Sequence, residues 1–431
     1  MSALTFGEAR HLVVRTGLGA EWGAIKHLEG RSRAEAVEMV LNPPRAALRS
    51  PPAMTPWFRL EPMRLSDPSN RKTAWNIAQE EGKRLQTWWL EQMLTTNAPF
   101  IERMTLFWHN HFTSSIQKTL QPSLLYKQNL MLRTHALGNF NSLLHEVIKD
   151  PAMLVYLDCY QNVKDRPNEN LARELLELFT LGRGHYSESD VKTVARALTG
   201  YGVDDQTGRF IERKELHDTD KMTCLGNTGC FTGGDIVDML LKHPRTAEHI
   251  AEKVWGAFVS SSRPNPVYIK AWAQAFRQSG YDIKALMRAV LTSEAFWLPA
   301  NRGALVKSPV DIVVGTLRTL PYPRPPTAEL LNLCRLLGQE LFDPPNVKGW
   351  AGGEHWISTQ TLLVRTSFLT KLSRGNLNEQ DSAGGLRLPT ATDAELVEWL
   401  LPVTPLQPLP TTPGAKRLVR ALLLDPAFQV A

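Results

Sequence analysis

The stretch Asn168-Glu-Asn-Leu-Ala-Arg-Glu-Leu-Leu-Glu-Leu-Phe-Thr-Leu-Gly182 carries the clearest helical pattern in the chain. With about 100° of rotation per residue, its polar side chains fall within an arc of about 140°, and leucine, alanine and phenylalanine fill the opposite side. The polar face holds Glu169, Asn170, Arg173, Glu174, Glu177 and Thr180. The stretch therefore predicts one amphipathic helix whose apolar side packs on a core.

The polar face of this helix has two interpretations. In the first it is a solvated surface, on which Glu169, Arg173 and Glu177 form a ladder of i,i+4 pairs worth about 0.2–0.5 kcal/mol each. In the second, Glu169, Glu174 and Glu177 are a carboxylate cluster that lines a polar cavity, with Arg173 balancing their charge. Such a cluster suits metal ligation or general acid/base work.

The rest of the chain extends the helical pattern. Apolar residues recur mostly at three- and four-residue spacing, which predicts a mainly α fold with a single multi-helix, bundle-like architecture. Between residues 201 and 234 the pattern changes to Gly, Asp, Thr and short β-like pieces, which predicts an excursion of loops and short strands. Helices are expected at Phe6–Thr16, Arg33–Leu41, Asn70–Thr95, Pro99–His111, Leu124–Leu137, Asn141–Lys149, Ala304–Leu320 and Ala328–Leu337, and a loop from Pro43 to Pro62.

The predicted organisation has five segments. They are an N-terminal helical segment (1–65), a helical core with the His and Glu motifs (66–200), the loop and short-β excursion (201–234), a helical half with a Pro-, Gly- and Trp-containing loop (235–375), and a Pro-rich link with a terminal helix (376–431).

Composition excludes several classes of protein. With 431 residues, 43% apolar and 21% charged, the chain is neither disordered, nor a disulfide-stapled miniprotein, nor fibrous. Its formal charge of +6 is spread without a run of like charges, which argues against nucleic acid as a partner. The N-terminus does not resemble a signal peptide and no long apolar stretch occurs, so we expect no transmembrane segment and, by default, a cytoplasmic location.

The cysteines are few, and two of them bracket a Gly-rich loop. Cys224 and Cys230 could form a disulfide, supply half of a metal site or be ordinary loop thiols. Their spacing matches none of the usual zinc motifs, which favours the last alternative.

Two histidines lie close together in Trp108-His-Asn-His111. On a continuous helix their side chains point about 160° apart and cannot bind one metal ion. Only an extended chain puts His109 and His111 on one side, as a chelate requires. The alternative is that they are core or capping residues.

Two loops hold further candidates. His217-Asp-Thr-Asp-Lys221 lies in the irregular region, where polar residues are often functional, although a turn with Asx hydrogen bonds explains them equally well. Trp350-Ala-Gly-Gly-Glu-His-Trp356 places a Gly-rich loop between two indoles. Such a loop either stacks a sugar ring or anchors the core, as do most tryptophans.

Long, specific stretches of the chain resemble a bacterial family catalogued as a domain of unknown function, number 1800, over nearly its full length. They are Met104–Phe112, Pro167–Gly182, Asp190 with Ala195–Gly200, His217-Asp218 with Lys221, and Pro344–Trp350 with Gly353 and Trp356. The resemblance implies a mostly helical fold. It also implies, in many cases, a companion of the unknown-function family numbered 1501, which looks similar to the alkaline phosphatase and sulfatase superfamily and is frequently exported. An exported or periplasmic location together with that partner is therefore the alternative to the cytoplasm.

The sequence thus predicts a metal-assisted enzyme, a hydrolase or an oxidoreductase, that works with this companion on a polymer or sugar substrate. The expected ligands of a divalent or transition metal are His109, His111, Glu169 and Asp220. The expected catalytic residues are Glu174, Glu177, Arg173 and His217, and the expected substrate-binding residues are Trp108, Trp350 and Trp356. The alternatives are a metal-free glycoside-processing enzyme that uses paired Glu residues and a non-catalytic helical partner or export escort.

Overall fold

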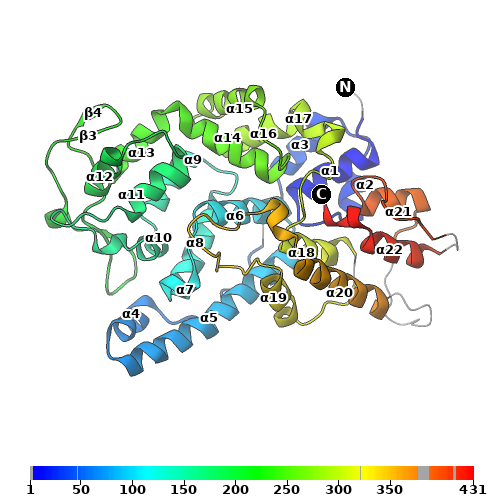
Figure 1. Cartoon of the computed structure of the whole chain (residues 1–431), viewed down its shortest axis with the longest axis horizontal. Coiled ribbons are helices and arrows are strands. Elements are labelled where there is room, and N and C mark those ends of the chain that lie inside the picture. Colours follow the sequence, from blue (N-terminus) through cyan, green and yellow to red (C-terminus); the bar gives the residue numbers. More distant parts are fainter. Residues whose placement is uncertain (1–2, 46, 321, 377–387, 411–413) are drawn as a thin grey trace.

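Helix α6 (Pro99–His111) lies near the middle of the molecule, and the other helices surround it (Figure 1). The computed structural model describes residues 3–45, 47–320, 322–376, 388–410 and 414–431. The first helices are α1 (Phe6–Thr16), α2 (Trp22–Leu28), α3 (Arg33–Leu41), α4 (Trp57–Leu65), α5 (Pro68–Thr95), α7 (Ile116–Thr119), α8 (Pro122–Thr134), α9 (Phe140–Val147), α10 (Pro151–Tyr156) and α11 (Asn170–Glu174).

The second half of the chain is built in the same way. Its helices are α12 (Glu188–Ala197), α13 (Gly233–Lys242), α14 (Pro244–Phe258), α15 (Pro266–Gln278), α16 (Ile283–Thr292), α17 (Glu294–Trp297), α18 (Pro309–Thr319), α19 (Thr327–Leu336), α20 (Thr359–Asn376), α21 (Asp393–Leu400) and α22 (Ala415–Leu424). Short helical turns are η1 (Cys159–Gln161), η2 (Leu175–Thr180, a π-helix), η3 (Lys214–Leu216), η4 (Pro299–Asn301), η5 (Gly353–Trp356) and η6 (Pro426–Gln429). The predicted mainly α fold is confirmed.

The β structure of the described residues is confined to two antiparallel hairpins in the predicted excursion. Strands β1 (Tyr201–Val203) and β2 (Phe210–Glu212) form one hairpin, and β3 (Met222–Cys224) and β4 (Asn227–Gly229) form the other. The prediction of short strands between residues 201 and 234 is therefore also confirmed.

Local capping signals fix several helix ends where the sequence placed them. Thr5 and Glu8 form a reciprocal capping box at the start of α1, and Ser32 and Glu35 do the same for α3. Pro99 occupies the first turn of α6, where its missing N–H costs nothing. The bounds predicted for these three helices match the structure because their signals are local.

Two predicted boundaries are wrong. The loop expected to reach Pro62 gives way to α4, which contains Pro62 although proline cannot donate to the carbonyl four residues earlier. Packing of Leu60 against Ala74 and Ala78 of α5 outweighs this loss. The helix expected from Ala304 begins only at Pro309, because Ser308 caps it.

The two ends of the chain lie side by side. Helix α1 packs beside α21, and α3 packs beside α16 (Figure 1). Arg10 on α1 donates from Nε to the carbonyl of Trp399 on α21 at 2.7 Å. The two hairpins lie at the opposite end of the molecule, and α4 with α5 projects from one edge (Figure 1).

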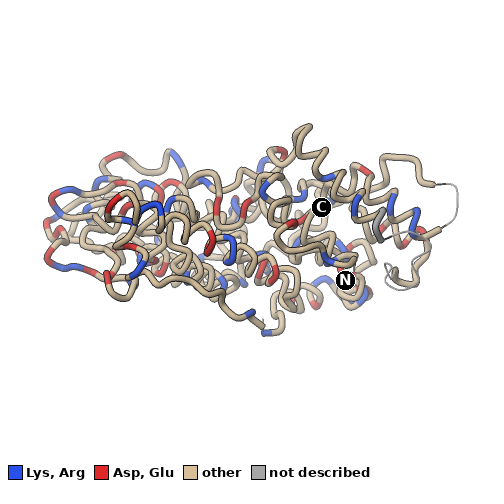
Figure 2. The backbone as a smooth tube through the Cα atoms, turned by 90° about the horizontal axis from the view of Figure 1, so that it is seen from below, with Lys and Arg blue, Asp and Glu red and all other residues tan. Residues whose placement is uncertain are grey.

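One large cluster of buried apolar side chains runs through the described residues, and it includes Leu12, Trp89, Phe140, Phe276 and Phe342. In Figure 2 basic and acidic positions are interspersed along the described chain rather than gathered into one basic stripe. No helix among the described residues has the length and apolar character needed to cross a membrane.

The predicted terminal segment is only partly described, since residues 377–387 and 411–413 of its Pro-rich link lie outside the described residues. All four cysteines are described, and each is a free thiol. Cys224 and Cys230 therefore form no disulfide, and only Cys230 is exposed.

Candidate functional site

Helix α6 continues to His111, so the two predicted metal ligands on it point in different directions. His109 is fully buried, and its ring packs against Trp89, Phe342 and Trp350. His111 lies on another side of the helix, where its Nε2 is 3.2 Å from the carbonyl oxygen of Phe179. The extended chain that a chelate by His109 and His111 requires is absent, because α6 is helical through both residues.

Neither ring nitrogen of His109 has a hydrogen-bond partner among the described residues. Burial lowers the pKa of this imidazole to about 3, so the ring is neutral over the physiological range. His109 is therefore held as an uncharged polar group inside an aromatic cage.

Asn110 and Trp108, from the same motif, have structural roles. The Asn110 side chain binds the main chain of Trp350 in both directions: Oδ1 accepts the N–H at 2.7 Å, and Nδ2 donates to the carbonyl at 3.4 Å. Trp108 is fully buried and donates from Nε1 to the carbonyl of Ala136. Trp108 is thus a core residue in this structure and not part of an exposed platform.

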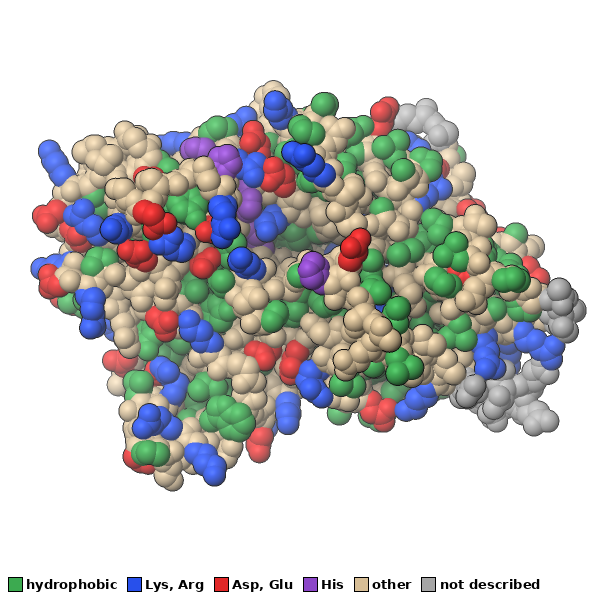
Figure 3. All heavy atoms as spheres, in the orientation of Figure 1, with side chains coloured by type: hydrophobic (Ala, Val, Ile, Leu, Met, Phe, Trp, Pro, Cys, Tyr) green, Lys and Arg blue, Asp and Glu red, His purple; other side chains and the backbone are tan. Residues whose placement is uncertain are grey.

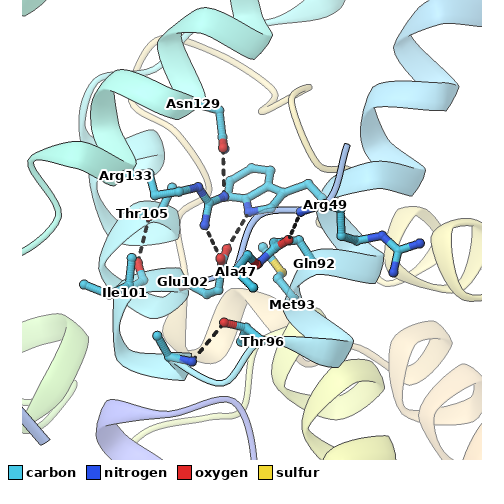
Figure 4. A network of polar contacts seen from close by, with 12 residues as sticks. Ala47, Arg49, Gln92, Met93, Thr96, Ile101, Glu102, Thr105, Asn129 and Arg133 are labelled. Atoms are coloured by element: carbon cyan, nitrogen blue, oxygen red, sulfur yellow. Dashed lines mark hydrogen bonds and ion pairs between the residues drawn. The ribbon is translucent and has the colours of Figure 1, made fainter. Parts of the chain in front are cut away.

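A buried ion pair fixes α6 to its neighbours (Figure 4). Arg133 of α8 pairs with Glu102 of α6, and Trp89 of α5 donates to the other carboxylate oxygen at 3.2 Å. Arg133 also donates to Asn129 at 2.9 Å. Glu102 is fully buried, so this pair orients the helix that carries the histidine motif.

The helix predicted at Asn168–Gly182 has the expected extent but not the expected regularity. After α11 the hydrogen bonding changes in η2, where the N–H of Leu181 donates to Leu176 and the hydroxyl of Thr180 donates to Leu175. The uniform rotation of 100° per residue is therefore wrong beyond Glu174.

Three side chains from other helices bind the carbonyls at this irregular turn. His249 Nε2 lies 2.9 Å from the oxygen of Leu178, His111 contacts that of Phe179, and Arg245 donates to that of Leu181 at 3.0 Å. π-helical turns are often found at functional sites. In this protein the turn is the point where α6 and α14 are joined to α11.

The carboxylates of this segment lie in different environments. Glu169 pairs with Arg173, which also binds Glu188, and all three side chains are at least a third exposed. This arrangement is the solvated ladder that was the first interpretation of the polar face, except that Glu188 replaces Glu177 as the second partner of Arg173.

Glu174 and Glu177 differ in proton affinity. Partial burial and the neighbouring Glu177 raise the pKa of the half-buried Glu174. The pKa of Glu177 is lowered, chiefly by the Tyr186 hydroxyl that donates to it at 2.6 Å and also by Arg183. At one pH, Glu174 therefore holds a proton more readily than Glu177 does.

The His217–Lys221 segment forms a hydrogen-bonded turn. Asp218 accepts from the N–H of Asp220 at 3.0 Å, which is the Asx turn given above as the alternative, and it pairs with Arg196 at 2.6 Å. His217 Nδ1 lies 3.0 Å from the carbonyl oxygen of Thr199. Asp220 itself is exposed.

The four predicted metal ligands do not converge. Among the described residues, no group of three or more His, Cys, Asp or Glu side chains is arranged to hold a metal ion. His109 lies in the core, whereas Glu169 and Asp220 lie at the surface.

A cavity with a volume of about 730 Å³ lies between α1, α6, α14 and α18. That size falls in the range of small-molecule sites. One wall is the loop Lys348–Trp356, which contains the predicted substrate-binding residues Trp350 and Trp356. Residues near the C-terminal end, including Phe428, close another side. Figure 3 shows this face of the molecule hollowed near its centre, with Lys, Arg and His side chains beside the hollow.

The cavity lining is strongly basic, and we call its cationic members the basic set. They are Arg10, Arg15, Arg103, Lys253, Lys307 and Lys348. The lining carboxylates are Asp311 and Glu354, and two histidines, His111 and His355, also line the cavity. Six cationic residues therefore face two carboxylates among the described residues.

Two arginines of the basic set are buried with only main-chain partners. Arg10 donates to the carbonyls of Trp399 and Leu400, and Arg15 donates to main-chain oxygens of Asn301 and Ala431, at 2.6 and 2.8 Å. Burial lowers the pKa of Arg10 to about 10, and burial with the nearby Arg103 lowers that of Arg15 to about 9. Both guanidinium groups therefore stay charged at neutral pH.

Asp311 is the buried carboxylate of the cavity, and it is already paired. Arg103 donates to its Oδ1 at 2.5 Å, and Ser308 donates to its Oδ2 at 2.8 Å. Burial alone would raise the pKa of Asp311, but these partners hold it below the usual value. Asp311 thus balances Arg103, and no other side-chain carboxylate among the described residues forms an ion pair with Arg10, Arg15 or Lys307.

Lys307 is the most unusual member of the basic set. Its side chain is buried, with 9% of the residue exposed, and its Nζ lies 3.8 Å from the centre of the Phe428 ring. Among the described residues, no carboxylate forms an ion pair with it and no acceptor takes a hydrogen bond from its Nζ. Burial and the nearby Arg10 lower the pKa of Lys307 well below the ordinary value.

The basic set was missed by the sequence analysis because its members come from five distant parts of the chain. One signal was present: Arg10 and Arg15 flank the apolar residues Leu12, Val13 and Val14 of the first helix, and both arginines are buried in the structure, as Leu12 is. Cationic residues on the buried side of an amphipathic helix are costly unless they have a partner or a ligand.

Comparison of the sequence with known proteins assigns the chain to a family. A family model described as "Protein of unknown function (DUF1800)" matches residues 11–430. No curated protein and no solved structure matches the chain.

Proposed function

The chain belongs to the DUF1800 family, whose description names no activity, and we propose on the geometry of the central cavity that it binds an anionic small molecule there. The observation that carries the proposal is Lys307, a buried amine that lines the cavity without an ion-pair partner among the described residues. The charged form of a buried, unpaired amine destabilises a fold, which is why the pKa of Lys307 is lowered. An anion bound beside Lys307 would offset that cost.

The electrostatics of the cavity support the same ligand class. Arg10 and Arg15 bring two further charges that carbonyl dipoles solvate but no side-chain carboxylate among the described residues neutralises. Arginine forms short, charge-assisted hydrogen bonds with carboxylate, phosphate and sulfate groups. Lys253 and Lys348 are exposed lining residues, and their charge would attract an anion from solution.

The loop Lys348–Trp356 supports a ligand that is larger than a bare ion. Trp350 and Trp356 line the cavity together with Leu106 and Phe107 of α6. Apolar walls with a few convergent charges are typical of sites for organic anions. A phosphorylated, sulfated or carboxylated sugar combines such a charge with a ring, which agrees with the sugar substrate predicted from these tryptophans.

Thermal unfolding in sulfate tests the proposal. Sulfate also stabilises proteins by exclusion from their surface, so the response must be compared between variants at equal ionic strength. Lys307→Met removes the unpaired cation, and Lys371→Met is the matched control because Lys371 lies on α20 with 78% of its side chain exposed. We expect the unaltered protein and Lys371→Met to show a rise in Tm with sulfate that Lys307→Met lacks. The corresponding gain in the free energy of unfolding is about 2.7 kcal/mol at a concentration of 100 times Kd.

Equal responses of the three proteins would contradict the proposal. If Lys307→Met does not fold, calorimetric titration of the unaltered protein with inorganic phosphate answers the same question. Saturable binding that sulfate competes with supports the site, and heat that does not saturate argues against it.

One of the predicted alternatives keeps a specific observation in its favour. The pKa values of Glu174 and Glu177 are shifted in opposite directions, as in pairs where one carboxyl acts as an acid and the other as a base. A metal-free glycoside-processing enzyme would lose activity in Glu174→Gln and keep it in the presence of a chelator. A panel of nitrophenyl glycosides supplies the assay, and Glu169→Gln is the matched control.

The metal-assisted enzyme and the partner of the family numbered 1501 remain predictions. Metal analysis by mass spectrometry on protein purified alone and together with that partner tests both. Less than about one equivalent of metal after supplementation would count against the metal-assisted enzyme. Failure of the two proteins to co-purify would count against the non-catalytic partner or escort.

A further inference from the structure

We propose that Lys307 is a nucleophilic amine that forms an imine with the carbonyl carbon of a small oxo acid held in the basic cavity. The inference deepens the proposed function and rests on it, because the carboxylate of the oxo acid is the anion that the cavity binds. It names both a reacting residue and a class of substrate.

The main chain fixes Lys307 on both sides. Its N–H donates to the carbonyl of Gln429 at 2.8 Å, and its own carbonyl accepts from Arg365 Nη2 at 2.9 Å. The neighbouring Val306 bridges to Val430. Covalent catalysis needs a nucleophile held in one place, and these contacts hold the backbone that carries the amine.

The groups around Lys307 favour its neutral form. Arg10 of α1 and Arg365 of α20 act on it as like charges, whereas Asp311 of α18 acts as an opposite charge but is bound to Arg103 of α6. From η6, Phe428 presents only its ring. Burial among cations lowers the pKa of the amine, and a neutral lysine is the form that attacks a carbonyl.

The cavity also offers partners for the rest of an oxo acid. Arg10 uses the carbonyls of Trp399 and Leu400 as partners and forms no ion pair with a side-chain carboxylate among the described residues, and Arg15, on which Arg10 acts as a like charge, lines the same cavity. A substrate carboxylate would meet these charges, which would leave its adjacent carbonyl carbon near Lys307. The volume of about 730 Å³ is ample for such a molecule.

The reaction needs no oxidant or reductant. The lone pair of Nζ forms a bond to the carbonyl carbon, and the π electrons of the C=O bond move to the oxygen, which takes up a proton. A proton leaves the nitrogen, which gives a carbinolamine. The hydroxyl oxygen takes up a second proton and leaves as water while the nitrogen lone pair forms the C=N bond, and the nitrogen then loses its remaining proton. The products are one imine and one molecule of water.

Reductive trapping tests the proposal on the full chain. The protein is incubated with glyoxylate and cyanoborohydride, which reduces an imine to a stable secondary amine, and the modified lysines are mapped by peptide mass spectrometry. We expect Lys307 to be modified ahead of Lys253 and Lys348, which are exposed lysines of the same cavity. We also expect its labelling to reach half of its maximum at a lower pH than theirs.

Sulfate and two variants separate the outcomes. Sulfate should slow the labelling of Lys307 at least several-fold while leaving Lys371 unaffected, and Lys371→Met should retain the fast adduct that Lys307→Met loses. The proposal that Lys307 forms an imine is overturned if the label is spread evenly over exposed lysines or if no adduct is found at Lys307. If sulfate still binds, only the imine fails, and if no anion binds, the proposed function fails as well.

Discussion

Asn110 and Trp350, which are 240 positions apart in the chain, are joined by two hydrogen bonds between one amide side chain and the main-chain N–H and C=O of one residue. The amide oxygen accepts the Trp350 N–H at 2.7 Å, so the loop that walls the cavity is tied to α6. Gly349 makes this contact possible, because a Cβ there would lie 2.2 Å from Asn110 Oδ1. The histidine motif and the tryptophan loop are thus parts of one structural unit.

Gly349→Ala should detach the loop, and Gly353→Ala is its matched control. Both glycines have positive φ values, 77° and 57°, so both substitutions strain the backbone. Only at residue 349 does the new Cβ collide with Asn110, since at residue 353 nothing lies within 4 Å. We expect Gly349→Ala to cost about 1–3 kcal/mol more than Gly353→Ala in urea unfolding. Equal costs would mean that Asn110 does not hold the loop.

Glu102→Gln should destabilise the protein far more than Glu169→Gln. The first change leaves Arg133 buried without its ion-pair partner, which typically costs about 3–5 kcal/mol. The second breaks an exposed i,i+4 pair with Arg173, worth about 0–1 kcal/mol. Chemical unfolding at pH 7 measures both. If the two variants lose a similar free energy of unfolding, the pair between Glu102 and Arg133 is not buried from water as the structure shows.

His109→Phe should reduce the acid sensitivity of the fold. The pKa of His109 is about 3 in the folded protein and about 6.5 in the unfolded chain, so only the unfolded state gains a proton between these values. The free energy of unfolding therefore falls by about 1.4 kcal/mol for each pH unit below 6.5 on account of this residue. Urea unfolding of both proteins at pH 7, 6 and 5 should show the difference, and parallel pH curves would refute it.

Lys307→Met should be more stable than the unaltered protein near neutral pH. The folded state disfavours the ammonium, so the free energy of unfolding of the unaltered protein rises as the pH rises from the lowered pKa towards about 10.4. The advantage of methionine should therefore shrink between pH 7 and pH 10. Thermal unfolding without added anions measures it, and a difference that does not change with pH would contradict the burial of an unpaired charge.

Helices with local signals could be predicted from the sequence. Pro99 and the apolar period fix α6, and the Thr5–Glu8 box fixes α1, because the groups that decide these helices lie within one turn. The change from α-helix to π-helix after Glu174 could not be predicted. His111, His249 and Arg245 bind its carbonyls from helices that precede or follow it by more than 60 residues.

The basic cavity could not be predicted from the sequence for a similar reason. Lys307 is one lysine before a capped helix, and nothing beside it in the sequence marks it. Its character comes from Arg10, Arg365 and Phe428, which only the tertiary fold brings near. The tryptophan loop stands out in the sequence, but its place on the cavity wall depends on the contact with Asn110 of α6, which the sequence does not indicate.

Because the cavity is built from both ends of the chain, it can be completed only late in synthesis. Arg10 and Arg15 leave the ribosome first, whereas Phe428, which closes the cavity beside Lys307, leaves last. At about 5–20 residues per second, the interval between them is tens of seconds. During synthesis, helix α1 is therefore exposed with its two cations for this interval before Phe428 can close the cavity beside them.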